Sequence, residues 1–251
     1  MVELVPFTAP WTAFRGKYNL ARWPWREIRR VARGLRSRRF DVGVSARPDP
    51  RDHALLAVSG AKQRLGFARA GSALLLTKSV TRPARVHRAD HWESIAAVLE
   101  IRIEAKAPVP RRGRRIVIHT GAGQPARLWP HKRFENLASA LARSGWEPEI
   151  LDDSLVGIEA LLDKLASADR FIGNDSGPGH LAALLGVPTF TIFGPQLPEL
   201  FAPRHPDSQW IEGAPCRYKP CRDYCRFPEP RCLTALEVEP VLARIHSWLS
   251  T

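Results

Sequence analysis

The sequence predicts an α/β fold built on parallel sheets, and three observations support this prediction. From about residue 114, short apolar strands alternate with helical segments, a pattern typical of a parallel sheet covered on both faces. The 251 residues, 44% of them hydrophobic, can bury the core of one large domain or two ordinary ones. Finally, polar and glycine-rich turns directly follow predicted strands, where open parallel sheets bind their ligands.

The second half carries the clearest pattern, and residues 109–251 are predicted to form a complete Rossmann-like domain. Strands are expected at 114–119, 147–151, 169–174 and 187–194, and helices at 131–145, 156–168, 177–186 and 235–249. The first half, residues 1–108, is predicted to be an incomplete Rossmann-like domain. Helices are expected there at 25–40, 51–60 and 89–101, a strand at 41–46 and a second short one at 64–67. Residues 107–115 are interpreted as a linker with solvated arginines.

Charge and composition limit the partners and the compartment. The formal net charge of +13 favours nucleic acid, an anionic membrane face or phosphorylated substrates. No apolar run approaches the roughly 20 residues of a membrane span, and the start lacks the features of a signal peptide. We therefore expect a cytoplasmic protein.

The turn "GNDSGPGH", residues 173–180, is the first candidate site. Its glycines allow close approach of a ligand, and the free N–H groups at a helix start attract an anion such as phosphate. Asp175 would repel a phosphate placed against it, so it is expected to bond backbone N–H groups or a sugar hydroxyl, whereas His180 could donate to a phosphate oxygen. The alternative is that Asp175 or Ser176 only caps the helix. A second loop, "HTGAG" at 119–123, follows the first strand of the same domain and should face the same cleft.

Two segments, "HTGAGQPARLWPHKRFENLASAL" and "FIGNDSGPGHLAALLGVPTFTIFGP", resemble glycosyltransferase family 9, the heptosyltransferase-like enzymes. The resemblance covers about residues 110–245 and continues more weakly upstream. It implies a GT-B fold, in which two Rossmann-like domains face a cleft and the second holds a nucleotide-sugar donor. It further implies that Thr120, Gly121, Ser176, Gly177 and His180 meet the donor diphosphate, with Asp175 shaping that loop.

The chain also departs from the family pattern. Arg127 stands where the family typically has lysine, and it can either neutralise a phosphate or remain a solvated loop charge. After the second strand of the domain, "ILDDSLVG" replaces a glycine-rich turn and a glutamate, so Asp152 or Asp153 is at best a substitute and adenine as the donor base is in doubt.

The family's catalytic base, an aspartate in a Gly-Asp motif, has no counterpart, because the sequence contains no Gly-Asp dipeptide. Three explanations stay open: a fragment lacking the start of the first domain, a non-catalytic protein, or an enzyme using another base. For the last, Asp49 and Asp52 are the candidates, although turn and helix-cap roles are more typical of such residues.

All four cysteines lie close together, at Cys216, Cys221, Cys225 and Cys232. Their spacing suits either a structural zinc or iron–sulfur site, or reduced thiols in a capping loop. Residues 21–40 carry eight arginines together with Trp23 and Trp25. Such a segment can lie on an anionic membrane or meet a phosphorylated glycolipid, or it is a solvated surface helix whose tryptophans fill the core.

Together these features predict an inverting glycosyltransferase that moves a heptose or similar sugar from a nucleoside-diphosphate donor to lipopolysaccharide core or a related glycan. No cofactor is required, because the helix N-terminus and Arg127 can hold the diphosphate. The alternative is a non-catalytic sugar-nucleotide-binding or scaffold protein. A nucleic-acid partner is not expected, since no recognised nucleic-acid-binding module is present.

Overall fold

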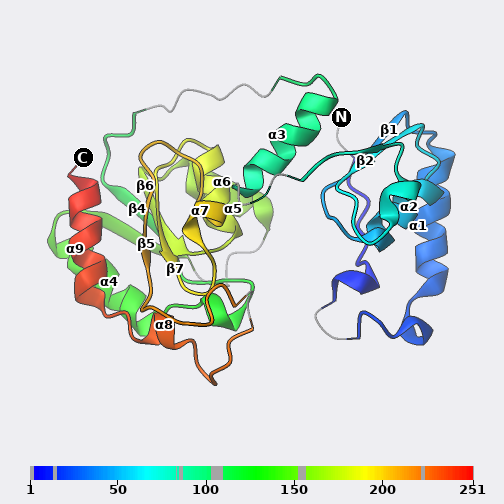
Figure 1. Ribbon diagram of the computed structural model, residues 1–251. Coiled ribbons are helices and arrows are strands. Elements are labelled where there is room, and N and C mark those ends of the chain that lie inside the picture. The colour runs from blue at the N-terminus through cyan, green and yellow to red at the C-terminus, as the bar shows by residue number, and fades with distance from the viewer. Residues whose placement is uncertain are drawn as a thin grey trace. The chain divides into compact units, whose positions relative to one another are not determined.

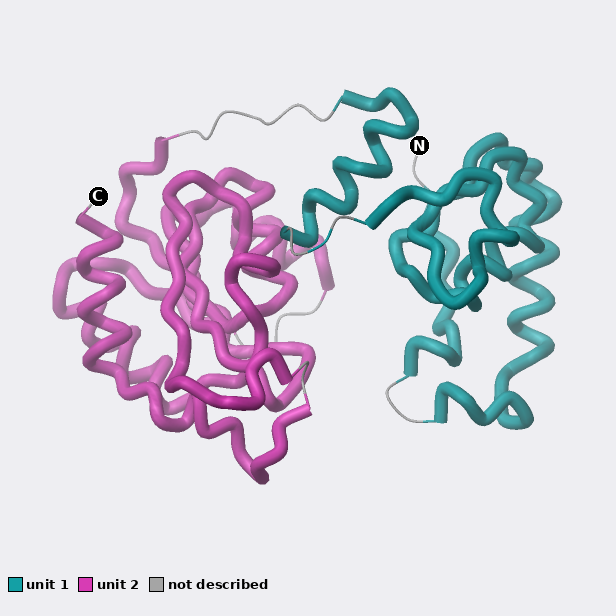
Figure 2. Tube along the Cα trace, in the orientation of Figure 1, with its two compact units in different colours: residues 1–104 teal, residues 105–251 magenta. Residues whose placement is uncertain are grey.

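The computed structural model describes residues 3–13, 16–82, 84, 87–102, 110–151, 157–221 and 224–250. The chain forms two compact units, Met1–Glu104 and Ala105–Thr251 (Figure 2). The predicted domain boundary at residue 108 lies outside the described residues.

Unit 1 contains a small parallel sheet with strand order β1-β2-β3 among its described residues. Its strands are β1 (Val42–Ser45), β2 (Gln63–Gly66) and β3 (Lys78–Ser79), the last not expected from the sequence. Its helices are α1 (Trp25–Ser37), α2 (Pro50–Val58) and α3 (Arg88–Val98), with short 3-10 turns at Pro10–Thr12, Leu20–Arg22 and Ser72–Leu75. Val31 and Ala32 of α1 are buried, as its helical periodicity predicts.

Unit 2 contains a larger parallel sheet, with strand order β5-β4-β6-β7-β8 in the described part of the chain (Figure 1). Its strands are β4 (Arg115–His119), β5 (Glu147–Leu151), β6 (Arg170–Asn174), β7 (Thr189–Phe193) and β8 (Gln209–Glu212). Its helices are α4 (His131–Arg143), α5 (Ile158–Ala166), α6 (Gly177–Leu184), α7 (Pro198–Phe201), α8 (Arg231–Thr234) and α9 (Val238–Leu249), with a 3-10 turn at Pro125–Arg127. Strand β8 was not expected, because "QWIE" is short and half exposed.

Helices cover both faces of the unit 2 sheet, as predicted for a Rossmann-like domain. On one face, Ile116 and Ile118 of β4 pack with Phe134 of α4 and Trp248 of α9. On the other face, Val117 of β4 belongs to a separate core cluster with residues of α5 and α6. Successive side chains of β4 therefore belong to core clusters on opposite faces of the sheet. The prediction of an α/β fold with parallel sheets is confirmed.

The prediction that the arginines of residues 107–115 stay solvated is wrong for Arg111. Its guanidinium donates to the carbonyl oxygens of Ala166 and Ala168, at and just after the end of α5, and of Leu185 and Gly186 after α6. A charged donor placed at helix C-termini satisfies carbonyl groups that lack partners within the helix. Arg111 therefore ties the start of unit 2 to the ends of two helices.

Candidate functional site

The two loops predicted to meet a ligand follow neighbouring strands. Strands β4 and β6 run in parallel with His119 opposite Gly173, so the loops that begin at Thr120 and Asp175 leave the same edge of the sheet. Gly173 sits where a Cβ would lie 3.0 Å from the His119 carbonyl oxygen. A side chain at position 173 would therefore push the two strand ends apart.

Asn174, at the end of β6, joins these loops and was missed in the sequence analysis. Its side chain is fully buried. The amide Nδ2 donates to the Thr120 carbonyl oxygen at 2.8 Å, and Oδ1 accepts from the backbone N–H of Trp129 at 3.0 Å. The available signal was a polar amide ending an otherwise apolar strand in "FIGN". Asn174 therefore holds the start and the end of the segment 120–129 against β6.

Ser176 occupies the N-cap position of α6, but its side chain makes no capping hydrogen bond. Among the described residues, its buried Oγ has no hydrogen-bond partner. The simple helix-cap interpretation of Ser176 therefore does not match the geometry. Gly177 is exposed, and a Cβ there would meet nothing within 4 Å. The first turn of α6 thus combines an unsatisfied hydroxyl with open space beside the backbone.

Arg127 points toward the same turn. Its Nη1 lies 3.3 Å from the Asp175 carboxylate and 3.5 Å from the Asp175 carbonyl oxygen. The Asp175 side chain is 4% exposed and that of Arg127 is 25% exposed. The ion pair draws the 120–129 loop toward α6 while part of the guanidinium still faces solvent. The Arg127 side chain is therefore held near α6 and is not a freely solvated loop charge.

The remaining predicted donor residues lie in the same region. Thr120 and Gly121 begin the loop after β4 and are partly exposed, and His180 is a half-buried residue near the start of α6. Behind them the loop rests on Trp129, whose indole is 1% exposed and donates to the Leu236 carbonyl oxygen at 2.8 Å. Asp152 and Asp153, weighed as contacts to the nucleoside, lie outside the described residues.

The two candidate bases in unit 1 are both engaged in local contacts. Asp49 caps α2 through the Arg51 backbone N–H and forms a two-pronged ion pair with the Arg51 guanidinium. These bonds to Arg51 lower the pKa of Asp49 to about 2. Asp52 accepts from the Trp11 indole at 2.5 Å and lies 3.5 Å from Arg47. The capping role expected of Asp49 is therefore present.

The four cysteines gather around one small cavity of about 20 Å³. All four are partly buried. Burial, with a smaller contribution from the neighbouring thiols, raises the pKa of Cys232. Within the described part of the chain, no group of three or more His, Cys, Asp or Glu residues has an arrangement that could hold a metal ion. The proposed zinc or iron–sulfur site is therefore not supported, because clustering of the thiols does not create ligand geometry.

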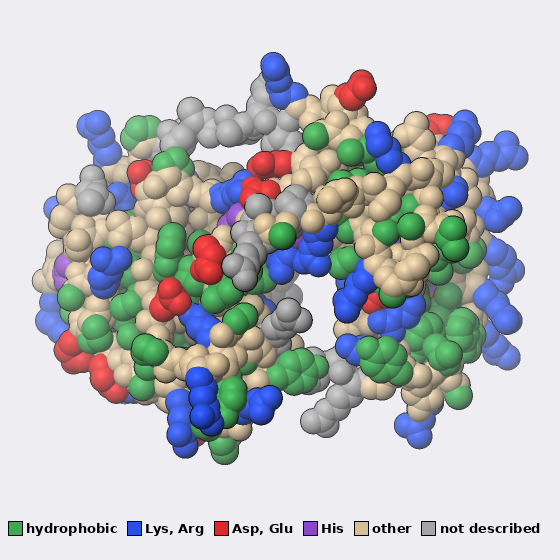
Figure 3. All heavy atoms as spheres, viewed as in Figure 1, with side chains coloured by type: hydrophobic (Ala, Val, Ile, Leu, Met, Phe, Trp, Pro, Cys, Tyr) green, Lys and Arg blue, Asp and Glu red, His purple; other side chains and the backbone are tan. Residues whose placement is uncertain are grey.

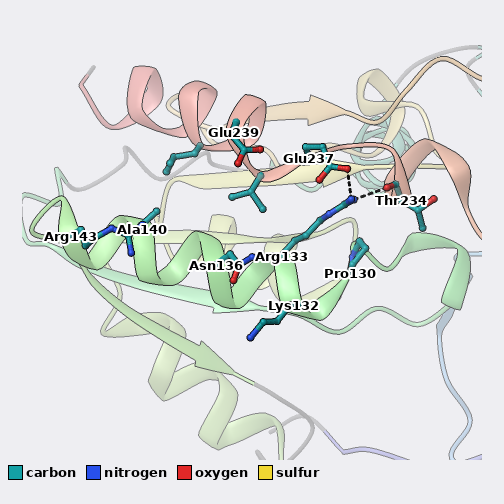
Figure 4. Close-up of a pocket in the computed structure, with 11 residues that line it drawn as sticks. Pro130, Lys132, Arg133, Asn136, Ala140, Arg143, Thr234, Glu237 and Glu239 are labelled. Atoms are coloured by element: carbon teal, nitrogen blue, oxygen red, sulfur yellow. Dashed lines mark hydrogen bonds and ion pairs between the residues drawn. The ribbon is translucent and has the colours of Figure 1, made fainter.

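A separate groove of about 560 Å³ lies between α4 and α9 (Figure 4). Arg133 crosses it from α4 and donates to the Thr234 carbonyl oxygen at 2.7 Å and to Glu237 at 2.5 Å. None of the predicted donor residues lines this groove. The Arg133 contacts instead fasten the start of α9 to α4.

Known proteins resemble the segment that contains the α6 turn. Residues 155–228 match the model of "Glycosyltransferase family 9 (heptosyltransferase)". The resemblance to this family that the sequence motifs indicated is therefore confirmed for this segment. Lipopolysaccharide heptosyltransferase 1 of Pseudomonas aeruginosa is 30% identical over 48% of this chain and 44% of its own length. Lipooligosaccharide heptosyltransferase 2 of Campylobacter jejuni is 31% identical over 37% of the chain and 29% of its own length. The chain thus spans less than half the length of these curated relatives in the matched segments.

Solved structures share its fold. E. coli ADP-heptose lipopolysaccharide heptosyltransferase II aligns with a TM-score of 0.67 at 16% identity, over 90% of this chain and 81% of its own. E. coli heptosyltransferase WaaC with ADP aligns with a TM-score of 0.68 at 18% identity, over 94% and 82%. The predicted GT-B fold class is confirmed by this likeness. A search of the described residues found no helix both long and apolar enough to cross a membrane.

Proposed function

We propose that this chain is an inverting glycosyltransferase that moves a heptose or similar sugar from a nucleoside-diphosphate donor to lipopolysaccharide core or a related glycan. The observation that carries the proposal is the α6 turn, where the Ser176 hydroxyl is buried without a partner among the described residues. The relatives named heptosyltransferases, and the neighbour solved with ADP, support an ADP-linked sugar as the donor.

In this proposal the donor diphosphate lies at the N-terminus of α6. The free N–H groups and the helix dipole attract its charge, and Ser176 Oγ donates to a phosphate oxygen. Arg127, held beside α6 by Asp175, neutralises charge that builds on the leaving diphosphate. His180 and the Thr120–Gly121 backbone complete the phosphate contacts. No metal ion is needed for this charge stabilisation.

Calorimetric titration with ADP, UDP, GDP and their sugar conjugates tests the donor site. Loss of two phosphate contacts in Ser176→Ala/His180→Ala should weaken nucleotide binding at least about tenfold, since one hydrogen bond to a charged group contributes roughly 1.5–3 kcal/mol. The matched control is Ser139→Ala/His131→Ala on α4, where both residues are exposed. Equal affinity in the two double variants would refute the assignment of the α6 turn.

The alternative is a non-catalytic protein that binds a sugar nucleotide or serves as a scaffold. One observation favours it: the carboxylates of Asp49 and Asp52 are both occupied by local partners. A general base works best with a pKa near the working pH, and a pKa of about 2 makes Asp49 a poor one.

Transfer from an ADP-sugar to a lipopolysaccharide acceptor, followed with Asp49→Asn and Asp52→Asn, separates the possibilities. Activity lost in Asp52→Asn alone would assign the base. Activity retained in both variants would exclude these two residues. Nucleotide binding without transfer in the unmodified chain would favour the non-catalytic alternative.

We further propose that the chain acts on the cytoplasmic side of a membrane, with α1 against the anionic surface. The exposed cations on and just after this helix are Arg26, Arg29, Arg30, Arg33, Arg36, Arg38 and Arg39. In Figure 3, Lys and Arg side chains gather along the edge of unit 1 where α1 lies. Each cation near an anionic surface contributes about 1 kcal/mol. Leu20 is 55% and Trp25 is 43% exposed beside them, and aliphatic exposure favours a bilayer over a nucleic acid.

Co-sedimentation with vesicles of phosphatidylglycerol and phosphatidylcholine tests this surface. Arg29→Gln/Arg33→Gln should weaken binding to anionic vesicles, and vesicles of phosphatidylcholine alone should bind poorly. Unchanged binding of the double variant, or tighter saturable binding to RNA at the same salt concentration, would count against the membrane assignment.

A further inference from the structure

A second basic region lies at the opposite edge of the unit 2 sheet. A pocket of about 500 Å³ is lined by Arg111, Arg112, Arg114 and Arg170, together with Trp146 and Leu249. The four arginines and Trp146 precede or begin β4, β5 and β6, and Leu249 ends α9, whereas the predicted donor loops follow β4 and β6. Five-residue strands separate the two edges by about 16 Å. We call this site the arginine pocket, and it is distinct from the α6 turn.

The arginine pocket carries more positive than negative charge. Among the residues that the structure describes, no acidic side chain lines it. Across the described ranges, none of its four guanidinium groups has an ion pair with Asp or Glu. Asp169, the nearest carboxylate in sequence to Arg170, instead accepts the backbone N–H groups of Gly113 and Arg115. Its negative charge lies beside the pocket and offsets part of the positive charge of the four arginines.

Two of the four arginines use their N–H donors mainly on backbone carbonyl oxygens, and the other two have donors available for a ligand. Arg111 uses its guanidinium on helix-end carbonyls, and Arg170 donates to the Arg111 and Asp169 carbonyl oxygens. Arg114 makes one bond, from Nη1 to the Gly145 carbonyl oxygen, and Arg112 is exposed. Each guanidinium carries five N–H donors, so Arg112 and Arg114 keep most of theirs for a ligand.

A neighbouring histidine responds to the same positive charge. The pKa of His205 is lowered mainly by burial, and Arg170 and Arg111 lower it further. Their guanidinium groups hydrogen-bond to backbone carbonyls, which leave the formal charge in place. An anion entering the pocket would therefore meet a net positive charge in a partly enclosed space.

We propose that the arginine pocket binds an oligophosphate anion. Planar guanidinium groups match phosphate oxygens in two-pronged hydrogen bonds, and several cations around one pocket suit a ligand with several negative charges. The volume is within the range of small-molecule sites. Trp146 and Leu249 supply an apolar side that limits access of water to the ion pairs. This binding does not depend on the proposed sugar transfer.

Calorimetric titration of the full chain with sodium tripolyphosphate, at constant ionic strength, tests the site. One equivalent should bind, and Arg112→Gln/Arg114→Gln should weaken it at least about tenfold through loss of two charged donors. The control Lys132→Gln/Arg244→Gln removes two exposed charges elsewhere in unit 2 and should change affinity less than about twofold. Thermal unfolding checks the fold of each variant, and Arg112→Gln alone replaces the double variant if that one unfolds.

Two results would overturn the proposal. One is the absence of saturable binding by the unmodified chain at physiological salt. The other is an equal loss of affinity in both double variants, which would mean that tripolyphosphate follows the net charge of the chain and not this pocket. Retained binding in Ser176→Ala/His180→Ala would separate the arginine pocket from the α6 turn.

Discussion

Replacement of Asn174 by alanine is the strongest test of how the candidate site is held together. The change removes the part-buried bond to the Thr120 carbonyl oxygen and the buried bond from the Trp129 N–H. Each buried backbone group left without a partner costs about 1–3 kcal/mol. The expected loss in the free energy of unfolding is therefore about 2–6 kcal/mol, a large share of the stability of an ordinary domain.

Urea unfolding followed by circular dichroism measures this loss, and hydrogen exchange adds a local readout. The Trp129 amide should exchange faster in Asn174→Ala, because its acceptor has gone. The matched control is Asn136→Ala, at an exposed position of α4, which should change stability by less than about 0.5 kcal/mol. A loss below about 1 kcal/mol in Asn174→Ala, with unchanged exchange at Trp129, would refute the conclusion that Asn174 holds the segment 120–129 against β6.

Three further outcomes are expected. Arg111→Gln should lower the free energy of unfolding by at least about 1.5 kcal/mol, because helix-end carbonyls lose a charged donor, and Arg112→Gln should not; equal denaturation curves would contradict this. Burial lowers the pKa of His53 below its usual value, so the unfolded chain takes up a proton first as the pH falls. Stability should then be full above about pH 6.5 and decline below it, by at most about 1.4 kcal/mol per pH unit for this residue, and His53→Gln should flatten the dependence of the melting temperature on pH. Burial raises the pKa of Cys232, so iodoacetamide should alkylate this thiol more slowly than Cys216 at pH 8. Peptide mass spectrometry measures the two rates, and faster modification of Cys232 would be inconsistent with its burial.

Local pattern determined much of this protein. The alternation of strands and helices from residue 114 predicted strands β4 to β7 and helices α4, α5, α6 and α9. The same pattern predicted that the "HTGAG" and "GNDSGPGH" loops share one sheet edge, since parallel strands all end on the same side. These features follow from the spacing of apolar residues and from turn chemistry within short segments. Short strands with exposed residues, such as β3 and β8, lack that spacing and were missed.

Tertiary structure alone decided which polar groups meet. Asn174 finds its partners 54 and 45 residues earlier in the chain, and Arg111 finds its carbonyls 55 to 75 residues later. The same packing gathered the four cysteines around one cavity without giving them metal geometry, and placed the Trp11 indole against Asp52, 41 residues away. The apolar residues on the buried face of a helix or strand are spaced only a few positions apart, and so they leave a periodic signal in the sequence. A hydrogen bond across the fold depends on where whole elements dock, which no local pattern records.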